Sequence, residues 1–424
     1  MDLRSLIILS IVVAGCVYAL KNAYVGALLM SWVAYMNPHR MSWGFAYSMP
    51  IALVATAVTA LALVFSKEKS APPLRAPLVY LLLFIFWAIG TSFFAWFPDE
   101  AMEELVRFLK IQIMILFTLM LFQNKEKLIW LVLVVSLSIG FFGFKGGVFA
   151  VATAGSYRVW GPPGSFIEGN NELALALLMV VPLIYFLHGY YQNKWIKRGL
   201  MLVMGFSLLA VLASYSRGAL LALACTGAML WWKSAHKFKI GVVAIILVLS
   251  VIPFIPQQWY DRMNTIETYE EDASAMGRIN SWYVAYNIAS DRIAGGGFRH
   301  WSKETFALYA PSPEDVHDAH SIYFEVLGEL GFPGLILFLL MHFSNWFLAS
   351  RTIKLCSGNE KLEWAEQLMK MVQVSMVAYA TGGTFLGLAF WDLPYHLICF
   401  VVLTNVIVRK ELDQSGQKKS GLRI

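Results

Sequence analysis

Long runs of apolar residues, separated by short polar connections, make up most of the chain. A helix needs roughly 20 mostly apolar residues to cross the hydrocarbon layer of a membrane. Eleven runs approach that length: Tyr47–Phe65, Pro77–Phe97, Val106–Phe122, Leu128–Val148, Glu172–Tyr190, Gly199–Ser214, Ala219–Trp232, Ile240–Ile255, Ile322–Ala349, Leu368–Phe390 and Tyr395–Val408. A further region, Leu6–Met36, is interrupted at Lys21-Asn22 and predicts one long broken helix or two short ones. The pattern predicts an all-α polytopic membrane protein with about 12 transmembrane helices, or 13 if Leu6–Met36 crosses twice.

Basic residues mark every second connection between these runs. Because Lys and Arg collect in cytoplasmic loops, the following groups predict the cytoplasmic side: Lys67/Lys69/Arg75, Lys125/Lys127, Lys194/Lys197/Arg198, Lys233/Lys237/Lys239, Arg351/Lys354/Lys361 and the tail from Arg409 to Arg423. The alternate connections, at residues 39–45, 98–104, 149–171, 215–218, 256–321 and 391–394, are then predicted to lie outside. This gives an organisation of N-terminal transmembrane helices (1–255), an outer loop domain (256–321), and C-terminal transmembrane helices with a cytoplasmic tail (322–424).

The outer loop domain carries one further helical pattern. Ile279, Trp282, Tyr283 and Tyr286 recur at the spacing of one face of a helix. The three glycines 295–297 are typical of a helix stop. We expect an amphipathic helix that lies against the membrane face or caps the bundle.

Composition agrees with a membrane protein. The 424 residues are 58% hydrophobic and 14% charged, against about 25% charged in a typical soluble domain. The net charge of +6 is explained by the cytoplasmic loops, and no basic run interleaved with aromatics predicts nucleic-acid binding. The four cysteines have no metal or disulfide spacing.

Polar residues that a purely structural membrane protein would not need concentrate in the outer connections. Arg158 precedes Asn171 at the start of a span, Arg217 occupies a very short turn, and Arg278 opens the amphipathic helix. The N-terminal end of a helix favours anions, and the planar guanidinium group of Arg can donate two hydrogen bonds to phosphate oxygens. A structural alternative stays open for each, because interfacial Arg also reaches for lipid headgroups.

Two histidines, His317 and His320, lie beside Asp315 and Asp318 just before a span. A metal site requires three or four ligands, and the sequence shows no third ligand beside the two histidines. The interpretation we favour is one histidine acting as a general base or acid; capping of the helix start is the structural alternative. Three arginines and a histidine together suit a diphosphate-linked donor, although no Gly-x-x-x-x-Gly-Lys or Asp-x-Asp motif is present.

The four motifs appear in a fixed order along the chain: Arg158…Gly161…Asn171-Glu172-Leu173-Ala174, Ser216-Arg217-Gly218-Ala219, Gly277-Arg278-Ile279…Trp282 and His320-Ser321…Tyr323…Glu325-Val326…Glu329-Leu330-Gly331. This series resembles the O-antigen ligase and O-antigen polymerase (Wzy-like) superfamily, which also includes bacterial protein O-oligosaccharyltransferases. The stretch from Lys145-Gly146-Gly147 to Gly161-Pro162-Pro163-Gly164 is similar to the exosortase-associated O-glycosylation ligase branch. The chain departs from the family in one place, since His320-Ser321 stands where the family often has His-Asn.

The resemblance implies a GT-C-like, metal-independent, inverting glycosyltransferase in a bacterial inner membrane, with its active site facing the periplasm. The implied donor is a glycan on undecaprenyl diphosphate, the implied acceptor is lipid A–core, and no cofactor is expected. Arg158, Arg217 and Arg278 would hold the diphosphate, and His320 would activate the acceptor hydroxyl. Candidates for a supporting role are Lys145, Asn171, His317 and Tyr323.

Three alternatives remain at this stage. A polymerase or a protein O-oligosaccharyltransferase would use the same donor with a different acceptor. A transporter of lipid-linked glycan is the alternative outside enzymes; it predicts ionisable groups or broken helices near the membrane midplane, whereas these spans are nearly free of charge.

Overall fold

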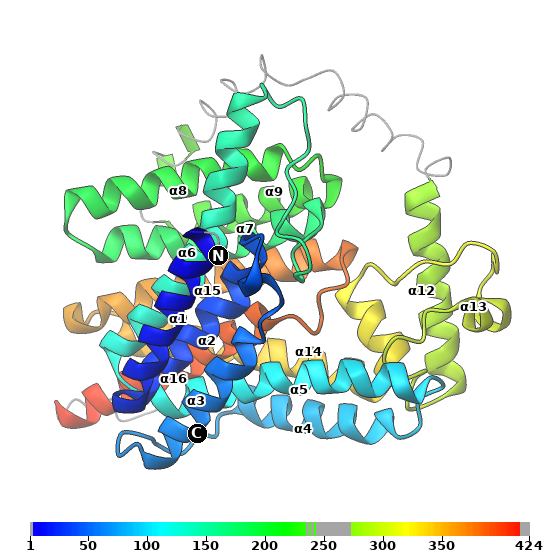
Figure 1. The fold of residues 1–424 in the computed structure, drawn as a ribbon, viewed down its shortest axis with the longest axis horizontal. Helices are drawn as coiled ribbons and strands as arrows, with labels where there is room; N and C mark the ends of the chain where they lie inside the picture. Colours follow the sequence, from blue (N-terminus) through cyan, green and yellow to red (C-terminus); the bar gives the residue numbers. More distant parts are fainter. Residues whose placement is uncertain (1–2, 235–236, 239–240, 243–272, 416–424) are drawn as a thin grey trace.

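The computed structural model describes residues 3–234, 237–238, 241–242 and 273–415. All its longer elements are α-helices (Figure 1), joined by short turns and 3-10 helices, so the predicted all-α class is confirmed. The helices are α1 (Leu3–Lys21), α2 (Ala23–Met36), α3 (Ile51–Phe65), α4 (Ala76–Ser92), α5 (Pro98–Leu121), α6 (Lys125–Ala152), α7 (Asn170–Tyr190), α8 (Lys194–Leu212), α9 (Arg217–Lys233), α12 (Ala273–Asp291), α13 (Lys303–Tyr309), α14 (Ile322–Cys356), α15 (Glu363–Gly382) and α16 (Asp392–Gln414).

Six of the described helices are long and apolar enough to cross a membrane: α1, α6, α7, α8, α14 and α16. Three shorter apolar helices, α2, α3 and α4, accompany them. The predicted count of about 12 spans is therefore not confirmed. The predicted run Ile240–Ile255 and the predicted domain boundary at 255/256 lie outside the described residues, apart from residues 241–242.

The region Leu6–Met36 forms two short helices, one of the two predicted outcomes, and the chain turns back between them at Asn22. A Cβ on Gly15 would lie 3.1 Å from the Leu29 side chain, and a Cβ on Gly26 would lie 3.1 Å from that of Ala19. Gly15 thus faces Leu29 and Ala19 faces Gly26, so the two helices run antiparallel, as in a helical hairpin. Whether this region crosses the membrane once or twice stays a prediction, since α1 is long enough to span and α2 is shorter.

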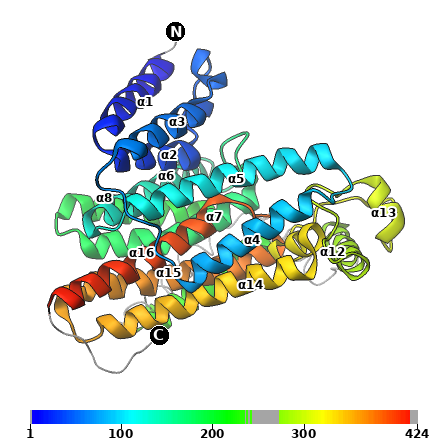
Figure 2. The ribbon, with the colours of Figure 1, turned by 90° about the horizontal axis from the view of Figure 1, so that it is seen from below.

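Helices α7 and α16 form the centre of the bundle, because 78% and 94% of the residues in their apolar stretches are buried. Figure 2 shows α4, α5 and α14 running along a common direction with α16. The 21 residues of α7 span about 30 Å, close to the thickness of a bilayer core.

The two ends of α7 lie among different connections. At its C-terminal end, Lys125 lies over the rings of Tyr190 and Trp364 at 5.8 and 5.1 Å. At its N-terminal end, the Asn170 side-chain amide donates to the Ser214 carbonyl at 2.7 Å. The connections predicted to be cytoplasmic therefore contact one end of α7, and those predicted to be outside contact the other. Which end faces the cytoplasm stays a prediction.

Helix α12 packs against α14 at one end of the bundle (Figure 1). The predicted helix is present, but two of the four residues on its predicted apolar face point outward: Tyr283 and Tyr286 are both 54% exposed. The buried face instead uses small and β-branched residues such as Val284 and Ile288, which pack with Phe306. The helix also ends at Asp291, before the three glycines.

Those glycines dock onto a break in α14. Pro333 has no N–H to offer to the carbonyl four residues before it, which is that of Glu329. That carbonyl accepts from the Gly297 N–H at 3.0 Å, the Gly328 carbonyl accepts from Gly296 at 2.8 Å, and the Leu330 carbonyl accepts from the Trp87 indole at 2.8 Å. Irregular backbone inside a membrane needs such partners. The break leaves the first turns of α14, with Glu325 and Glu329, facing the candidate site.

Candidate functional site

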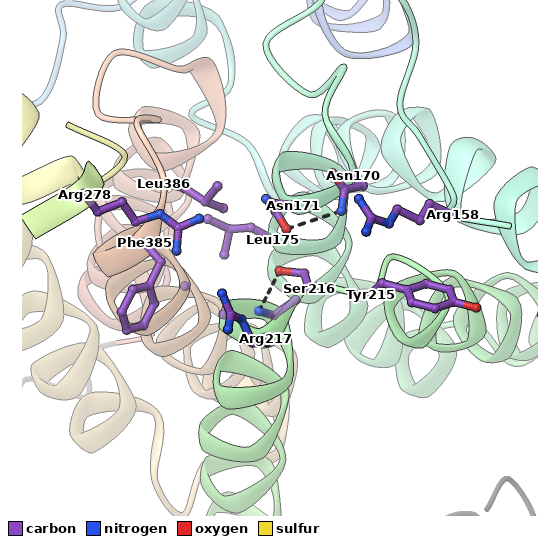
Figure 3. Close-up of a pocket in the computed structure, with 13 residues that line it drawn as sticks. Arg158, Asn170, Asn171, Leu175, Tyr215, Ser216, Arg217, Arg278, Phe385 and Leu386 are labelled. Atoms are coloured by element: carbon purple, nitrogen blue, oxygen red, sulfur yellow. Dashed lines mark hydrogen bonds between the residues drawn. The ribbon is translucent and has the colours of Figure 1, made fainter. Parts of the chain in front are cut away.

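Three arginines that are far apart in the sequence line one small pocket. Arg158, Arg217 and Arg278 surround a cavity of about 80 Å³, together with Asn170 and Asn171 at the start of α7. Figure 3 shows the three guanidinium groups approaching this space from three different elements: the connection before α7, the start of α9, and α12. The sequence placed these residues in three outer connections, and the structure brings them together.

The position of Arg217 is fixed by its turn. Ser216 is the N-cap of α9, where its hydroxyl accepts from the Ala219 N–H at 3.1 Å. Tyr215 adopts a left-handed backbone conformation with φ 58°, which is uncommon for a residue other than glycine, and its hydroxyl donates to the Gly155 carbonyl. The turn therefore presents Arg217 together with the N-terminal end of α9, which itself favours an anion.

Arg158 is held against the same turn. The N–H of the next residue, Val159, donates to the Ala213 carbonyl at 3.1 Å, and the Val159 side chain is buried. Gly169 occupies the N-cap of α7, and the Asn170 side-chain amide donates to the Ser214 carbonyl. Asn170 thus ties the start of α7 to the turn that carries Arg217.

Arg278 reaches the pocket because α12 is anchored to the connection that carries His320. The Asn280 amide donates to the carbonyls of Ser312 and Asp315 at 2.8 and 2.9 Å. The Trp282 indole donates to the Ala319 carbonyl at 2.8 Å. These contacts fix the position of Arg278 relative to His320, although the two residues are 42 positions apart in the sequence.

His320 lines a second, larger cavity of about 520 Å³ rather than the arginine pocket. Its backbone is left-handed, with φ 43°. Burial lowers the pKa of His320 below its usual value of 6.5, and the positive charge of Arg278 lowers it further, while Asp318 acts in the opposite direction. The imidazole is therefore neutral near pH 7 and able to accept a proton.

The two cavities adjoin. Asn171 and Leu386 line the arginine pocket, and the residues that follow them, Glu172 and Gly387, line the His320 cavity. The three arginines and His320 therefore line two separate spaces, whose walls both include the start of α7 and the segment 386–387.

Of the predicted supporting residues, Asn171 lines the arginine pocket, and the other three line neither cavity. Lys145 is exposed on α6. His317 forms an ion-pair contact with Asp315 at 2.8 Å, and the Tyr323 hydroxyl donates to the Ala380 carbonyl at 2.9 Å. Within the described ranges, no three His, Cys, Asp or Glu side chains gather as metal ligands would.

The sequence reasoning missed the charged wall of the larger cavity. Glu325 and Glu329 lie one turn apart on α14, and Arg107 and Arg299 approach from α5 and from the loop after the three glycines. The sequence did contain a signal for Glu325 and Glu329, because both lie in the apolar run Ile322–Ala349 and ionisable residues in such a run indicate a functional site. Arg107 lies at the start of the predicted span Val106–Phe122 and was not singled out, and α5 begins earlier than that span, at Pro98.

Two protein-family models match parts of this chain. Residues 202–339, which contain Arg217, Arg278 and His320, match the family model described as O-antigen ligase. This match supports a relationship to the O-antigen ligase superfamily. Residues 3–192, which contain Arg158, match a model described as a family of unknown function (DUF5935). No curated protein matches the chain. The family match and the apolar helices together point to a multi-pass membrane protein.

Proposed function

We propose that this chain is an inverting glycosyltransferase of the bacterial inner membrane. It moves a glycan from undecaprenyl diphosphate to a sugar hydroxyl of lipid A–core at the periplasmic face. The observation that carries this proposal is the pocket of three guanidinium groups adjoining a cavity lined by a neutral histidine.

The arginine pocket suits the diphosphate of the donor. Arg158, Arg217 and Arg278 provide planar groups that can each donate two hydrogen bonds to phosphate oxygens, and the N-terminal end of α9 adds its partial positive charge. A volume of about 80 Å³ is well below the roughly 300–1,000 Å³ of sites for larger ligands. The pocket is thus of a size for phosphate groups rather than for a whole sugar.

His320 suits the acceptor side of the reaction. Its neutral imidazole takes the proton of the acceptor hydroxyl while the hydroxyl oxygen attacks the anomeric carbon of the donor sugar. The bond from that carbon to the diphosphate oxygen breaks in the same displacement, so the configuration inverts. The lipid diphosphate leaves with its new charge stabilised by the three arginines, and the proposed reaction therefore uses no metal ion or cofactor.

A reconstitution tests the proposal. The full chain, in lipid vesicles with a lipid-linked glycan, is given lipid A–core, no added acceptor, or a pilin-like protein. We expect glycosylated lipid A–core, lost in Arg217→Ala and retained in Arg198→Ala, because Arg198 lies over Trp195 in a connection expected on the opposite side. Longer lipid-linked glycan as the only product would assign a polymerase, and a glycosylated protein as the only product would assign a protein O-oligosaccharyltransferase.

A further inference from the structure

One face of α12 docks on the connection before α14. Gly277, Asn280 and Ser281 share this face, because they occupy positions i, i+3 and i+4 of the helix. The Asn280 side chain accepts from the Ser312 N–H at 2.9 Å, and the Ser281 hydroxyl donates to the His317 carbonyl at 3.0 Å. In the connection these bonds use backbone groups only. They hold it against α12 without requiring particular side chains there.

His317 adds a side-chain contact at the start of the same face. Gly277 is buried, and a Cβ built on it would lie 2.5 Å from Cδ2 and 2.9 Å from Nε2 of the His317 ring. Both distances are shorter than a Cβ atom can tolerate. The glycine therefore allows the imidazole ring to lie directly on the backbone of α12.

Asp315 fixes the orientation of that ring. His317 Nε2 lies 2.8 Å from Asp315 Oδ1, and the imidazole is the donor because an ionised carboxylate can only accept. The two side chains are 45% and 43% exposed, so their contact contributes little to stability by itself. Its consequence is local: it sets where the ring lies on Gly277.

The residue after Gly277 is Arg278, which reaches from α12 into the arginine pocket (Figure 3). His317 lines neither cavity. We infer that His317, oriented by Asp315, is a positioning residue that sets the place of Arg278 in the arginine pocket through its contact with Gly277. This inference rests on the proposed function, because it concerns the donor subsite of that reaction.

The donor alone is sufficient to test this inference. His317 also precedes His320 by three positions, but binding of a diphosphate lipid without acceptor depends on the arginine pocket and not on the proposed base. The full chain in lipid vesicles is therefore titrated with labelled undecaprenyl diphosphate. In His317→Ala we expect the dissociation constant to rise by about tenfold, a usual size for coupling within one hydrogen-bonded network.

Two further variants show whether the contact with Asp315 is what matters. His317→Gln should bind nearly as tightly as wild type, because the glutamine amide can donate to Asp315 in place of Nε2. Glu314→Ala is the matched control, since Glu314 is exposed in the same connection and lines neither cavity. It should keep the wild-type affinity. Thermal unfolding of each variant checks that the fold is intact.

A double-mutant cycle shows whether His317 acts through Arg278. A residue that acts only through another has no effect once the other is replaced. Arg278→Gln should weaken binding, and adding His317→Ala to it should change the dissociation constant no further. A general disturbance of the fold would instead weaken both backgrounds by the same factor.

Gly277→Ala examines the same contact from the side of α12. The new Cβ displaces the His317 ring from its contact with Asp315, so donor binding should weaken although alanine favours a helix over glycine. In the His317→Ala background the ring is absent, and Gly277→Ala should then have no further effect. Equal losses in both backgrounds would contradict the contact between ring and glycine.

The outcomes separate this inference from the proposed function. Wild-type affinity in His317→Ala, or equal losses with and without Arg278, would overturn the inference and leave the proposed transferase intact. A chain that binds the diphosphate with the expected pattern but transfers glycan to no acceptor would defeat the proposed function and leave the role of His317 in place. Absence of donor binding by the wild-type chain would overturn both.

Discussion

Arg278 and His320 line different cavities, yet the charge of Arg278 lowers the pKa of His320. The link is mechanical as well as electrostatic. Asn280 and Trp282, both on the helix of Arg278, bind the backbone of the connection that ends in His320. A cation that is proposed to hold the donor therefore also keeps the proposed base neutral.

A pH profile of kcat/KM should show this coupling. A base must be deprotonated to act, so the rate falls as pH decreases through its pKa, and for His320 that fall should lie below pH 6.5. In Arg278→Gln the loss of the positive charge stabilises the protonated imidazole. The acid limb should then move to higher pH.

Arg217→Gln is the control for that measurement, because Arg217 is not among the charges that shift the pKa of His320. It should reduce the rate at every pH and leave the midpoint of the acid limb in place. Equal shifts in both variants, or in neither, would contradict the coupling of Arg278 to His320.

Replacing His320 should separate proton transfer from donor binding. His320→Ala is expected to lower kcat by about 10²–10⁴-fold, the usual contribution of a general base. Binding of a labelled undecaprenyl diphosphate should persist, because the arginine pocket is built from other elements. The measurement pairs single-turnover rates with equilibrium binding. Wild-type turnover in the variant would remove His320 from the catalytic role.

Replacing Arg217 with lysine should have the converse effect. Lysine keeps the charge but loses the planar fork that donates two hydrogen bonds to one phosphate. A hydrogen bond to a charged group contributes about 1.5–3 kcal/mol, so the donor dissociation constant should rise by roughly 10–100-fold. Equilibrium binding in vesicles measures it, with Arg198→Lys as control. Unchanged affinity in Arg217→Lys would place the diphosphate elsewhere.

The sequence was sufficient for the helical class, and it singled out the three arginines that line one pocket, because both depend on local signals. Apolar runs define helices whatever their neighbours are, and arginines in short outer turns are unusual enough to be noticed. The alternation of basic loops correctly separated the residues that contact the two ends of α7.

What could not be predicted depends on contacts between distant segments. The outward position of Tyr283 and Tyr286 follows from α12 docking through its small residues, and spacing alone cannot tell which side of a helix will dock. The division into two cavities depends on where residues 386–387 meet the start of α7. The break at Gly331 arises from Pro333 acting together with a glycine turn about 35 residues earlier.

That break gives a prediction about stability. Gly331 has φ 68° and ψ −175°, a region that is essentially restricted to glycine and costs other residues about 1–3 kcal/mol. A Cβ there would also collide with the carbonyl oxygen of Ile293. Gly331→Ala should therefore lower the unfolding temperature of the purified chain and loosen the docking of residues 295–297, seen as faster hydrogen exchange at Gly296 and Gly297. Gly205→Ala is the matched control, since a Cβ at Gly205 in α8 meets no atom within 4 Å among the described residues and alanine favours a helix over glycine by up to about 1 kcal/mol. Its unfolding temperature should stay level or rise. Equal unfolding temperatures for Gly331→Ala and wild type would show that the glycine turn does not hold the first turns of α14, and with them Glu325 and Glu329, against the cavity.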